Sequence, residues 1–416
     1  MTRTVFTGAR IFDGSGSDPA AGDVAVENGR IVELGPRLDG DESVDLGGLT
    51  ILPGLFDCHV HVVLTTIDQW RILNLPFSYR FYEAAENLGA TLRAGITTVR
   101  DAGGADLGIK RALADSLIAG PRLQISLAMI SQTGGHGDEW MPFGGAVPLL
   151  PSHPGVPPVI VDGPDEMRRK VRELIRMGTD VIKVATSGGV LSPRDDPRHA
   201  HFRPAELDVL VEEATAAGIW VMAHAQGTDG IKNAVRAGIR SIEHGVYLDD
   251  EAISLMLEHG TWLVATLVAP QGVVDAAEAG AQVPEAAVEK AHQVIEIHRE
   301  SFRRAVDAGV RIAMGTDSGV TAHGRNLREL KLMADAGMRP ADVLVATTRS
   351  AAELMGVLDE VGTIEPGKVA DLTVVSGDPY DFDDLPDRIE AVYQAGVRVA
   401  PAATAANAGP ATSGGG

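Results

Sequence analysis

Two histidines one residue apart, His59 and His61 in the segment FDCHVHV, are the first residues of this sequence that could do chemistry. Further along the chain, other residues with metal-binding side chains stand in or just after short apolar runs, and these are Lys183, His224, His244 and Asp317. Imidazole and carboxylate ligands that leave one position open for water are what a hydrolytic zinc site needs. These residues are therefore the candidate metal ligands.

The context of the first pair distinguishes it from a second one. Side chains alternate along a strand, so His59 and His61 at the end of an apolar run point to the same side. The other pair, His199 and His201 in RHAHF, lies among prolines and arginines with no apolar run to orient it. We expect only the first pair to bind metal. By the same alternation, Lys183 is an inward-facing residue in apolar surroundings.

The elements that must position these residues are short β-branched runs alternating with longer helical patterns. The runs are FDCHVHV, GITTVRDAG, RLQISLAMIS, TDVIKVATSGG, IWVMAHA, IRSIEHG, TWLVATLV and VRIAMGTDSG. Helical patterns lie between them, including a long one from 285 to 308, and many end in glycine, a common residue after a helix C-terminus. Eight strand-helix repeats predict an α/β fold, a (β/α)8 TIM barrel, whose chemistry lies at the C-terminal ends of the strands.

Both ends of the chain have a different pattern, with short alternating apolar runs and turn signals such as Asn28-Gly29. We expect residues 1–50 and 361–400 to pair into one small composite β-sandwich, and residues 51–360 to form the barrel domain. Residues 401–416 are expected to be a disordered tail. The segment 132–163 is rich in glycine and proline, and its Trp140, Met141 and Phe143 are expected to form an apolar lid.

Composition narrows the class of partner. The formal net charge of −21 over 416 residues argues against nucleic acid and anionic membranes, because phosphate groups would be repelled. There is no apolar run of transmembrane length and no signal-peptide pattern. The single cysteine, Cys58, cannot form an internal disulfide. A lone cysteine suits a reducing compartment, so we expect a cytoplasmic protein. Its expected partner is a small-molecule substrate of the candidate metal site.

The order HxH, Lys, His, His, Asp resembles that of the binuclear members of the amidohydrolase superfamily. Further similarity lies in LPGLFDCHVHV, GITTVRDAGG, SQTGGHGD, IKVATSGGVLSP, IEHG, GTDSG with HGRNLREL, and GTIEPGKVADLTVV. The resemblance covers essentially the whole chain. It is strongest to the branch of metal-dependent Xaa-Pro dipeptidase-like and carboxypeptidase-like enzymes, which implies hydrolysis of the C–N acyl bond of dipeptides or N-acyl amino acids. A homo-oligomer is expected because relatives commonly form one.

The resemblance also implies two divalent metal ions, expected to be zinc. His59, His61 and Asp317 would hold the buried ion, and His224 and His244 the exposed one. Lys183 would be carboxylated by CO2, and its carbamate would bridge both ions; burial favours the neutral amine that this reaction requires.

The implied reaction uses a hydroxide that bridges the metal ions as nucleophile, with Asp317 as general base and then general acid. His136 in TGGHGD resembles a substrate-contacting histidine and would stabilise the developing oxyanion. Further substrate contacts are expected from Gln226, His323, Asn326 and Trp140.

One departure leaves the substrate open. Dipeptidase-like relatives often carry a tyrosine two residues after the histidine of the fifth strand, where this chain has Gln226. Recognition of a substrate carboxylate is therefore in doubt, and a non-peptide amide, carbamate or urea is an alternative substrate. A mononuclear deaminase or imidazolone hydrolase is a further alternative, although deaminases place a glutamate where Gly227 stands. A non-catalytic scaffold is a third, although no ligand is lost here.

Overall fold

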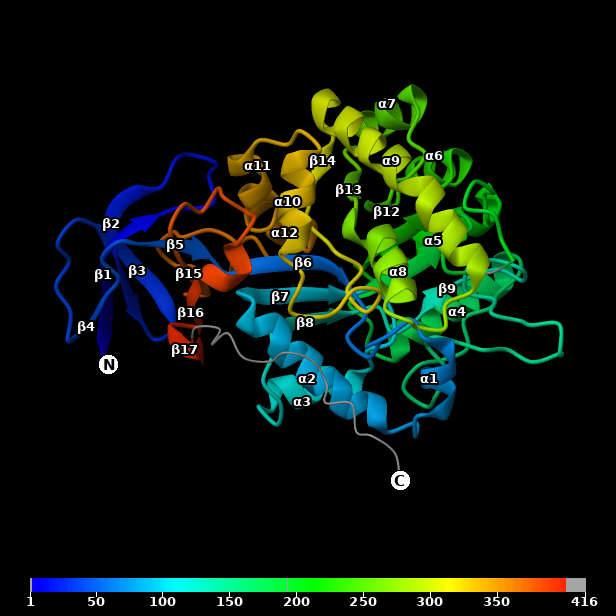
Figure 1. The fold of residues 1–416 in the computed structure, drawn as a ribbon, viewed down its shortest axis with the longest axis horizontal. Coiled ribbons are helices and arrows are strands. Elements are labelled where there is room, and N and C mark those ends of the chain that lie inside the picture. Colours follow the sequence, from blue (N-terminus) through cyan, green and yellow to red (C-terminus); the bar gives the residue numbers. More distant parts are fainter. Residues whose placement is uncertain (1, 193, 402–416) are drawn as a thin grey trace.

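The strands of the barrel run parallel to their neighbours in two sheets, which Figure 1 shows from the side. The computed structural model describes residues 2–192 and 194–401. Two parallel sheets supply the ring, and β8 and β9 are two pieces of one strand position. The strands are β6 (Leu55–Val60), β7 (Ile96–Asp101), β8 (Arg122–Ile125), β9 (Met129–Ile130), β10 (Val181–Ala185), β11 (Trp220–Ala225), β12 (Ser241–His244), β13 (Trp262–Val264) and β14 (Arg311–Ile312). A hydrogen bond of 2.9 Å from Cys58 N to Met314 O closes the ring. The predicted (β/α)8 barrel is confirmed.

Helices surround the barrel (Figure 1). Proline begins α4 and α5, where the missing N–H has no intrahelical partner to lose, and a left-handed glycine ends α7 and α9. The pattern predicted over 285–308 forms a single helix, α9. The helices are α1 (Gln69–Asn74), α2 (Tyr79–Arg93), α3 (Leu107–Ala114), α4 (Pro164–Arg176), α5 (Pro204–Ala216), α6 (Thr228–Arg236), α7 (Asp250–His259), α8 (Val268–Glu278), α9 (Glu285–Ala308), α10 (Arg328–Asp335), α11 (Pro340–Ala346), α12 (Arg349–Leu354) and the short 3-10 helix η1 (Leu385–Arg388).

A separate sheet contains strands from both ends of the chain, as predicted. Its order is β17-β16-β15-β5-β1-β2-β3, and β4 pairs with β1. The strands are β1 (Arg3–Ile11), β2 (Ala20–Glu27), β3 (Arg30–Gly35), β4 (Glu42–Asp45), β5 (Leu49–Pro53), β15 (Leu372–Ser376), β16 (Ile389–Gln394) and β17 (Val397–Pro401). The antiparallel pair β5-β15 joins the two ends, and Phe6 packs edge-on against Tyr393 across the buried face, with ring centroids 4.9 Å apart. The fold is thus a TIM barrel with an added β domain.

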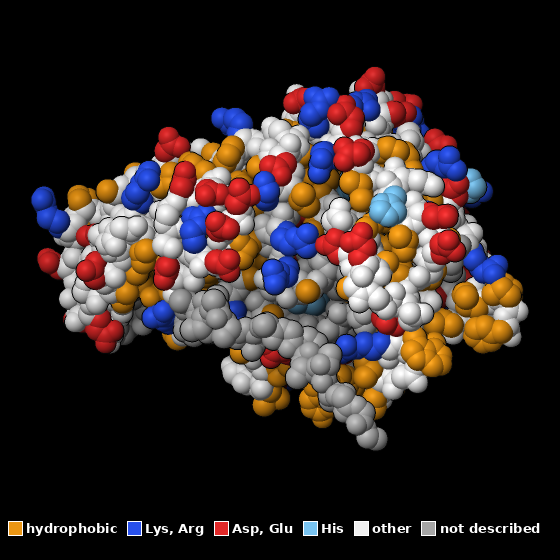
Figure 2. All heavy atoms as spheres, viewed as in Figure 1, with side chains coloured by type: hydrophobic (Ala, Val, Ile, Leu, Met, Phe, Trp, Pro, Cys, Tyr) orange, Lys and Arg blue, Asp and Glu red, His pale blue; other side chains and the backbone are white. Residues whose placement is uncertain are grey.

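The segment between β9 and α4 forms no helix, and its pairing is limited to isolated bridges. Hydrophobic side chains gather at the edge of the molecule where this segment projects (Figures 1 and 2). On the face shown in Figure 2, acidic and basic side chains are interspersed, so the net negative charge is not gathered into one patch there. In the described ranges, no helix is long and apolar enough to cross a membrane. The expected tail lies outside the described residues, apart from Pro401 at the end of β17.

Candidate metal centre

The predicted ligands meet at the C-terminal ends of the barrel strands. His59 lies in β6 and His61 follows it; Lys183, His224 and His244 lie in β10, β11 and β12, and Asp317 follows β14. All of them line one cavity. Because the strands are parallel, side chains far apart in the sequence are brought to the same end of the barrel.

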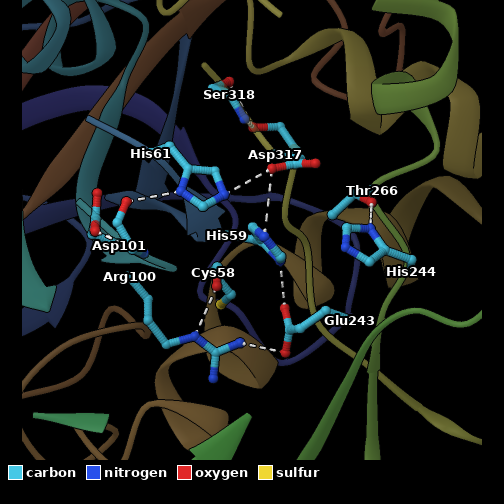
Figure 3. A network of polar contacts seen from close by, with 12 residues as sticks. Cys58, His59, His61, Arg100, Asp101, Glu243, His244, Thr266, Asp317 and Ser318 are labelled. Atoms are coloured by element: carbon cyan, nitrogen blue, oxygen red, sulfur yellow. Dashed lines mark hydrogen bonds and ion pairs between the residues drawn. The ribbon is translucent and has the colours of Figure 1, made fainter. Parts of the chain in front are cut away.

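His59, His244 and Asp317 form the tightest group, with one potential ligand atom from each lying within 4.8 Å of the others. Asp317 Oδ1 lies 3.2 Å from His61 Nε2 and 3.5 Å from His59 Nε2 (Figure 3). The ring of His224 lies beside that of His244, with centroids 4.6 Å apart. These distances place four imidazoles and a carboxylate around one point of the barrel mouth.

Each of the four histidines has one ring nitrogen engaged by a residue outside the group. The Nδ1 atoms of His59, His61 and His244 lie 2.7, 2.8 and 2.7 Å from Glu243 Oε2, Gly103 O and Thr266 Oγ1 (Figure 3). His224 instead donates from Nε2 to Gly188 O at 3.1 Å. Metal-binding histidines show this arrangement, because the partner of one nitrogen fixes the tautomer and aims the other at the metal. The opposite nitrogen of every ring is therefore available as a ligand.

Electrostatics favours the metal-binding forms of three histidines and of Asp317, whereas the hydrogen bond to and the charge of Asp317 outweigh burial and raise the pKa of His61. Burial lowers the pKa values of His59, His224 and His244 well below the ordinary value, so these imidazoles are neutral. Burial acts to raise the pKa of Asp317, but the adjacent imidazoles of His59 and His61, together with the hydrogen bond from His61, hold it below the usual range. Asp317 is therefore a carboxylate.

Lys183 has the least usual environment in the group. Its side chain is only 1% exposed, and Nζ has no hydrogen-bond partner among the described residues. Burial lowers the pKa of this amine to about 8. A buried amine without a partner is costly. A chemical modification that gives this amine metal-binding oxygens would remove that cost. Together with the four imidazoles and the Asp317 carboxylate, a modified Lys183 would form a donor set that fits divalent metal ions.

Glu243 supports this centre and was not among the predicted site residues. It is fully buried, accepts hydrogen bonds from Ser241 Oγ at 2.6 Å and from Arg100 Nη2 at 3.0 Å, and contacts His59. Arg100 also donates from Nε to Cys58 O at 2.7 Å, next to His59 in the chain (Figure 3). Arg100 and Glu243 are charged residues inside strands whose other side chains are largely uncharged. This feature of the sequence could have indicated a buried ion pair.

Two of the predicted substrate contacts line the same cavity. His136 stacks on His224 with ring centroids 4.1 Å apart, and its Nδ1 lies 2.7 Å from Ser192 Oγ. Gln226 is buried, and its side-chain Oε1 has no hydrogen-bond partner among the described residues. Both side chains are placed where a substrate held at the metal-ligand group could meet them.

Three other predicted contacts are placed outside the cavity lining. His323 donates from Nε2 to His61 O at 3.2 Å and Leu64 O at 3.1 Å. Asn326 is buried and donates to Asp57 Oδ2 at 2.8 Å. These two side chains hold the segment that carries the histidine pair. Trp140 is 48% exposed and lies beside the guanidinium of Arg194 on the outer side of its loop.

The second histidine pair is not part of the group. The ring of His199 is largely exposed, whereas His201 is buried. Neither residue lines the cavity. The two side chains of this pair differ in exposure because the irregular loop does not turn them to the same side. The sequence had indicated this, since no apolar run surrounds the pair.

A closed (β/α)8 barrel with this donor set at its strand ends defines a class, the metal-dependent hydrolases built on a TIM barrel. The model of the amidohydrolase family matches residues 50–406, and the chain belongs to this family. The resemblance noted from the motifs is confirmed. The enzyme is a hydrolase that acts on C–N bonds.

Similar proteins include several with known activities. The chain is 34% identical to ochratoxinase of Aspergillus niger over 347 residues, which cover 80% of this chain and 71% of the relative. It is 30% identical to imidazolonepropionase of Rhizorhabdus wittichii over 387 residues, covering 85% and 87%. The structure of a Xaa-Pro dipeptidase with methionine in its active site matches with a TM-score of 0.86 at 30% identity, covering 95% of this chain and 99% of that one.

Proposed function

We propose that this enzyme hydrolyses the amide bond of small substrates such as dipeptides or N-acyl amino acids, using a binuclear metal centre. The observation that carries the proposal is the buried amine of Lys183, which lies among the histidine and aspartate ligands and has no hydrogen-bond partner in the described part of the chain. The similarity to ochratoxinase and to a Xaa-Pro dipeptidase supports the same bond type.

The residues fit two divalent ions, for which we propose zinc. His59, His61 and Asp317 would hold one, His224 and His244 the other, and a carboxylated Lys183 would contribute one oxygen to each. When bound, such ions polarise the scissile carbonyl and make water nucleophilic near neutral pH.

The protein's own groups would handle protons and charge. Asp317 is a carboxylate at the centre of the group, so it can accept the proton of the attacking water and pass it to the leaving nitrogen. His136 lines the cavity and would stabilise the oxygen that gains charge. Ser192, which is hydrogen-bonded to Asp195, holds the other nitrogen of this imidazole.

The wall of the cavity sets the kind of substrate. Besides the polar residues already named, it is mostly apolar, with Leu64, Met129, Met141, Val147, Leu149, Leu150, Val156, Val159, Val190, Leu191, Val246, Val273 and Val320 among its lining residues. Apolar walls with a few placed polar groups bind compact hydrophobic substrates. An amide with apolar substituents is the substrate that these surroundings favour.

Non-peptide amides, carbamates and ureas remain alternatives on the same centre, because Gln226 stands where dipeptidase-like relatives often carry a tyrosine that helps to hold the substrate carboxylate. A mononuclear deaminase or imidazolone hydrolase is the weaker alternative. A Cβ atom at Gly227 would lie 2.5 Å from Arg198 O, so a deaminase-type glutamate could not stand there without moving the loop.

The test is a substrate panel assayed with the zinc-loaded enzyme. Dipeptides, N-acyl amino acids, aryl carbamates, phenylureas, imidazolones and heterocyclic amines would be compared, with Lys183→Ala as the control for contaminating peptidases. Cleavage of dipeptides or N-acyl amino acids that is lost in Lys183→Ala supports the proposal. Turnover confined to imidazolones or heterocyclic amines would overturn it.

A further inference from the structure

The loop between β9 and α4 brings a carboxylate to the cavity wall. Residues 139–147 form a small hairpin: Trp140 bridges with Ala146, and Val147 N donates to Glu139 O at 3.1 Å. Alternation along the hairpin separates its two faces. Glu139, Met141 and Val147 line the cavity, whereas Trp140 lies on the outer face. The loop thus presents one acidic side chain amid apolar ones.

The Glu139 carboxylate is held in place but only half satisfied. Leu149 N donates to Oε1 at 3.0 Å, and this is the only hydrogen bond to the carboxylate from the described residues. Burial raises the pKa of this group to about 7. A carboxylate enclosed by apolar side chains is costly without a cation or a donor beside it. Because the side chain is only partly buried at the cavity wall, its second oxygen is open to a partner that enters the cavity.

The charges of the cavity wall indicate what that partner is. Among the described residues that line the cavity there is no arginine, and Lys183 is the one lysine. Apart from the imidazoles, the charged groups are Lys183 and Asp317, both in the metal-ligand group, and Glu139 on the loop. A positively charged substrate group would be the natural counter-ion of Glu139, and an ammonium with three donors can fill its free oxygen.

We propose that Glu139 binds the α-ammonium group of the substrate, so that the enzyme selects dipeptides with a free, apolar N-terminal residue over their N-acyl counterparts. The inference rests on the proposed amide hydrolysis and narrows its substrate class. Met141, Val147 and Leu149 of the same loop also line the cavity and would contact the side chain of that residue. The scissile carbonyl is attached to the same carbon as the ammonium, so Glu139 would position the acyl half of the substrate.

The test compares two substrates that differ only in the ammonium group, L-leucyl-L-leucine and 4-methylpentanoyl-L-leucine. For the wild-type enzyme we expect kcat/KM to favour the dipeptide at least about tenfold, the size of a charge-assisted contact. In Glu139→Gln this ratio should fall to about one, mainly through a higher KM for the dipeptide. Activity on 4-methylpentanoyl-L-leucine should persist.

The matched control is Asp229→Asn. Asp229 is exposed near the start of α6 and does not line the cavity, so its substitution removes one negative charge elsewhere. This variant should keep the wild-type ratio. The proposal fails if the wild-type enzyme hydrolyses both substrates without favouring the dipeptide, if Glu139→Gln keeps the preference, or if Asp229→Asn loses it equally.

A binding measurement separates this inference from the proposed function. Titration calorimetry would compare 3-methylbutylamine with 3-methylbutan-1-ol on the full-length wild-type protein and on Glu139→Gln. Tighter binding of the amine that is lost in the variant supports the ammonium site even if neither peptide is hydrolysed, which would overturn only the amide hydrolysis. Equal amine binding by both proteins overturns the role of Glu139.

Discussion

Nδ1 of His59 lies 2.7 Å from Oε2 of Glu243, a residue 184 positions later in the chain. The other oxygen of this carboxylate lies 3.0 Å from Arg100 Nη2, and all three side chains are buried. The carboxylate thus fixes the orientation of the imidazole, while the arginine balances its charge. This contact couples the first and sixth strands of the barrel to the geometry of the candidate metal centre.

Glu243→Gln should weaken metal binding. The amide keeps the shape of the side chain but loses the charge that orients His59 and pairs with Arg100. We expect metal affinity or activity to fall by roughly 10- to 100-fold, the usual effect of removing a partner of a metal-binding histidine. Metal content after dialysis against a graded series of chelator concentrations is the measurement.

The sequence provides a matched control, because the tripeptide Glu243-His244-Gly245 recurs as Glu258-His259-Gly260 at the end of α7. Glu258 is exposed there. Glu258→Gln should bind metal as the wild type does. Equal metal affinity in Glu243→Gln and Glu258→Gln would show that the buried contact has no part in the centre.

Lys183→Ala tests the bridging role proposed for the lysine. The variant should lose most activity, because neither metal ion would have the bridging oxygens. Short-chain carboxylic acids at millimolar concentrations should restore part of the activity by supplying a carboxylate in the space left by the side chain. The control is Lys331→Ala on the outer surface of α10, which should be fully active and insensitive to the acids. A fully active Lys183→Ala would exclude the carbamate.

The second histidine pair yields a prediction about acid stability. Burial lowers the pKa of His201 to about 4 from an ordinary value of 6.5. Below pH 6.5 the unfolded chain therefore binds a proton that the folded chain does not, and the free energy of unfolding falls as pH drops from 6.5 toward 4. His201→Gln should reduce the dependence of the unfolding free energy on pH by up to about 1.4 kcal/mol per pH unit, the contribution of one proton. Urea unfolding of chelator-treated protein at several pH values measures it.

The exposed neighbour of the pair is the comparison. His199→Gln changes the same residue type two positions away without removing a buried imidazole, so its stability should follow the wild-type curve. If His201→Gln shows the full wild-type slope, the buried ring is not responsible for the acid sensitivity.

Asn326→Ala distinguishes a supporting role from substrate contact. Its side chain donates to Asp57 and to Ser318 Oγ, and its Oδ1 accepts from Gly324 N. Removing it leaves buried groups unsatisfied, which should cost roughly 1–3 kcal/mol of stability. The ranking of substrates by kcat/KM should stay unchanged. Asn74→Ala, on the exposed α1, should affect neither property. An altered ranking of substrates in Asn326→Ala would indicate that this residue contacts the substrate, as the sequence suggested.

The barrel could be predicted because strand ends are local features. Short β-branched runs alternating with helical patterns gave the fold, and His59, Lys183 and His224 were found because each interrupts or ends such a run. Parallel strands then had to bring their C-terminal ends together. Neither step requires knowledge of which distant side chains touch.

Contacts between distant residues could not be predicted in the same way. Glu243 and Arg100 form a pair although they are 143 positions apart, and the sequence around each residue does not indicate which residue it contacts. The irregular loop posed a related difficulty. Without a known strand pairing in the loop, the sequence could not indicate which of its side chains face the cavity. The hairpin register is what turns Met141 and Glu139 to the cavity and Trp140 away from it.

The metal content of the purified full-length protein tests the central proposal most directly. Mass spectrometry of wild type, Lys183→Ala and Lys331→Ala would be performed after zinc loading and removal of free metal. The binuclear centre predicts two zinc ions per chain in wild type and Lys331→Ala, and a clear loss in Lys183→Ala. One ion per chain in all three proteins would contradict it.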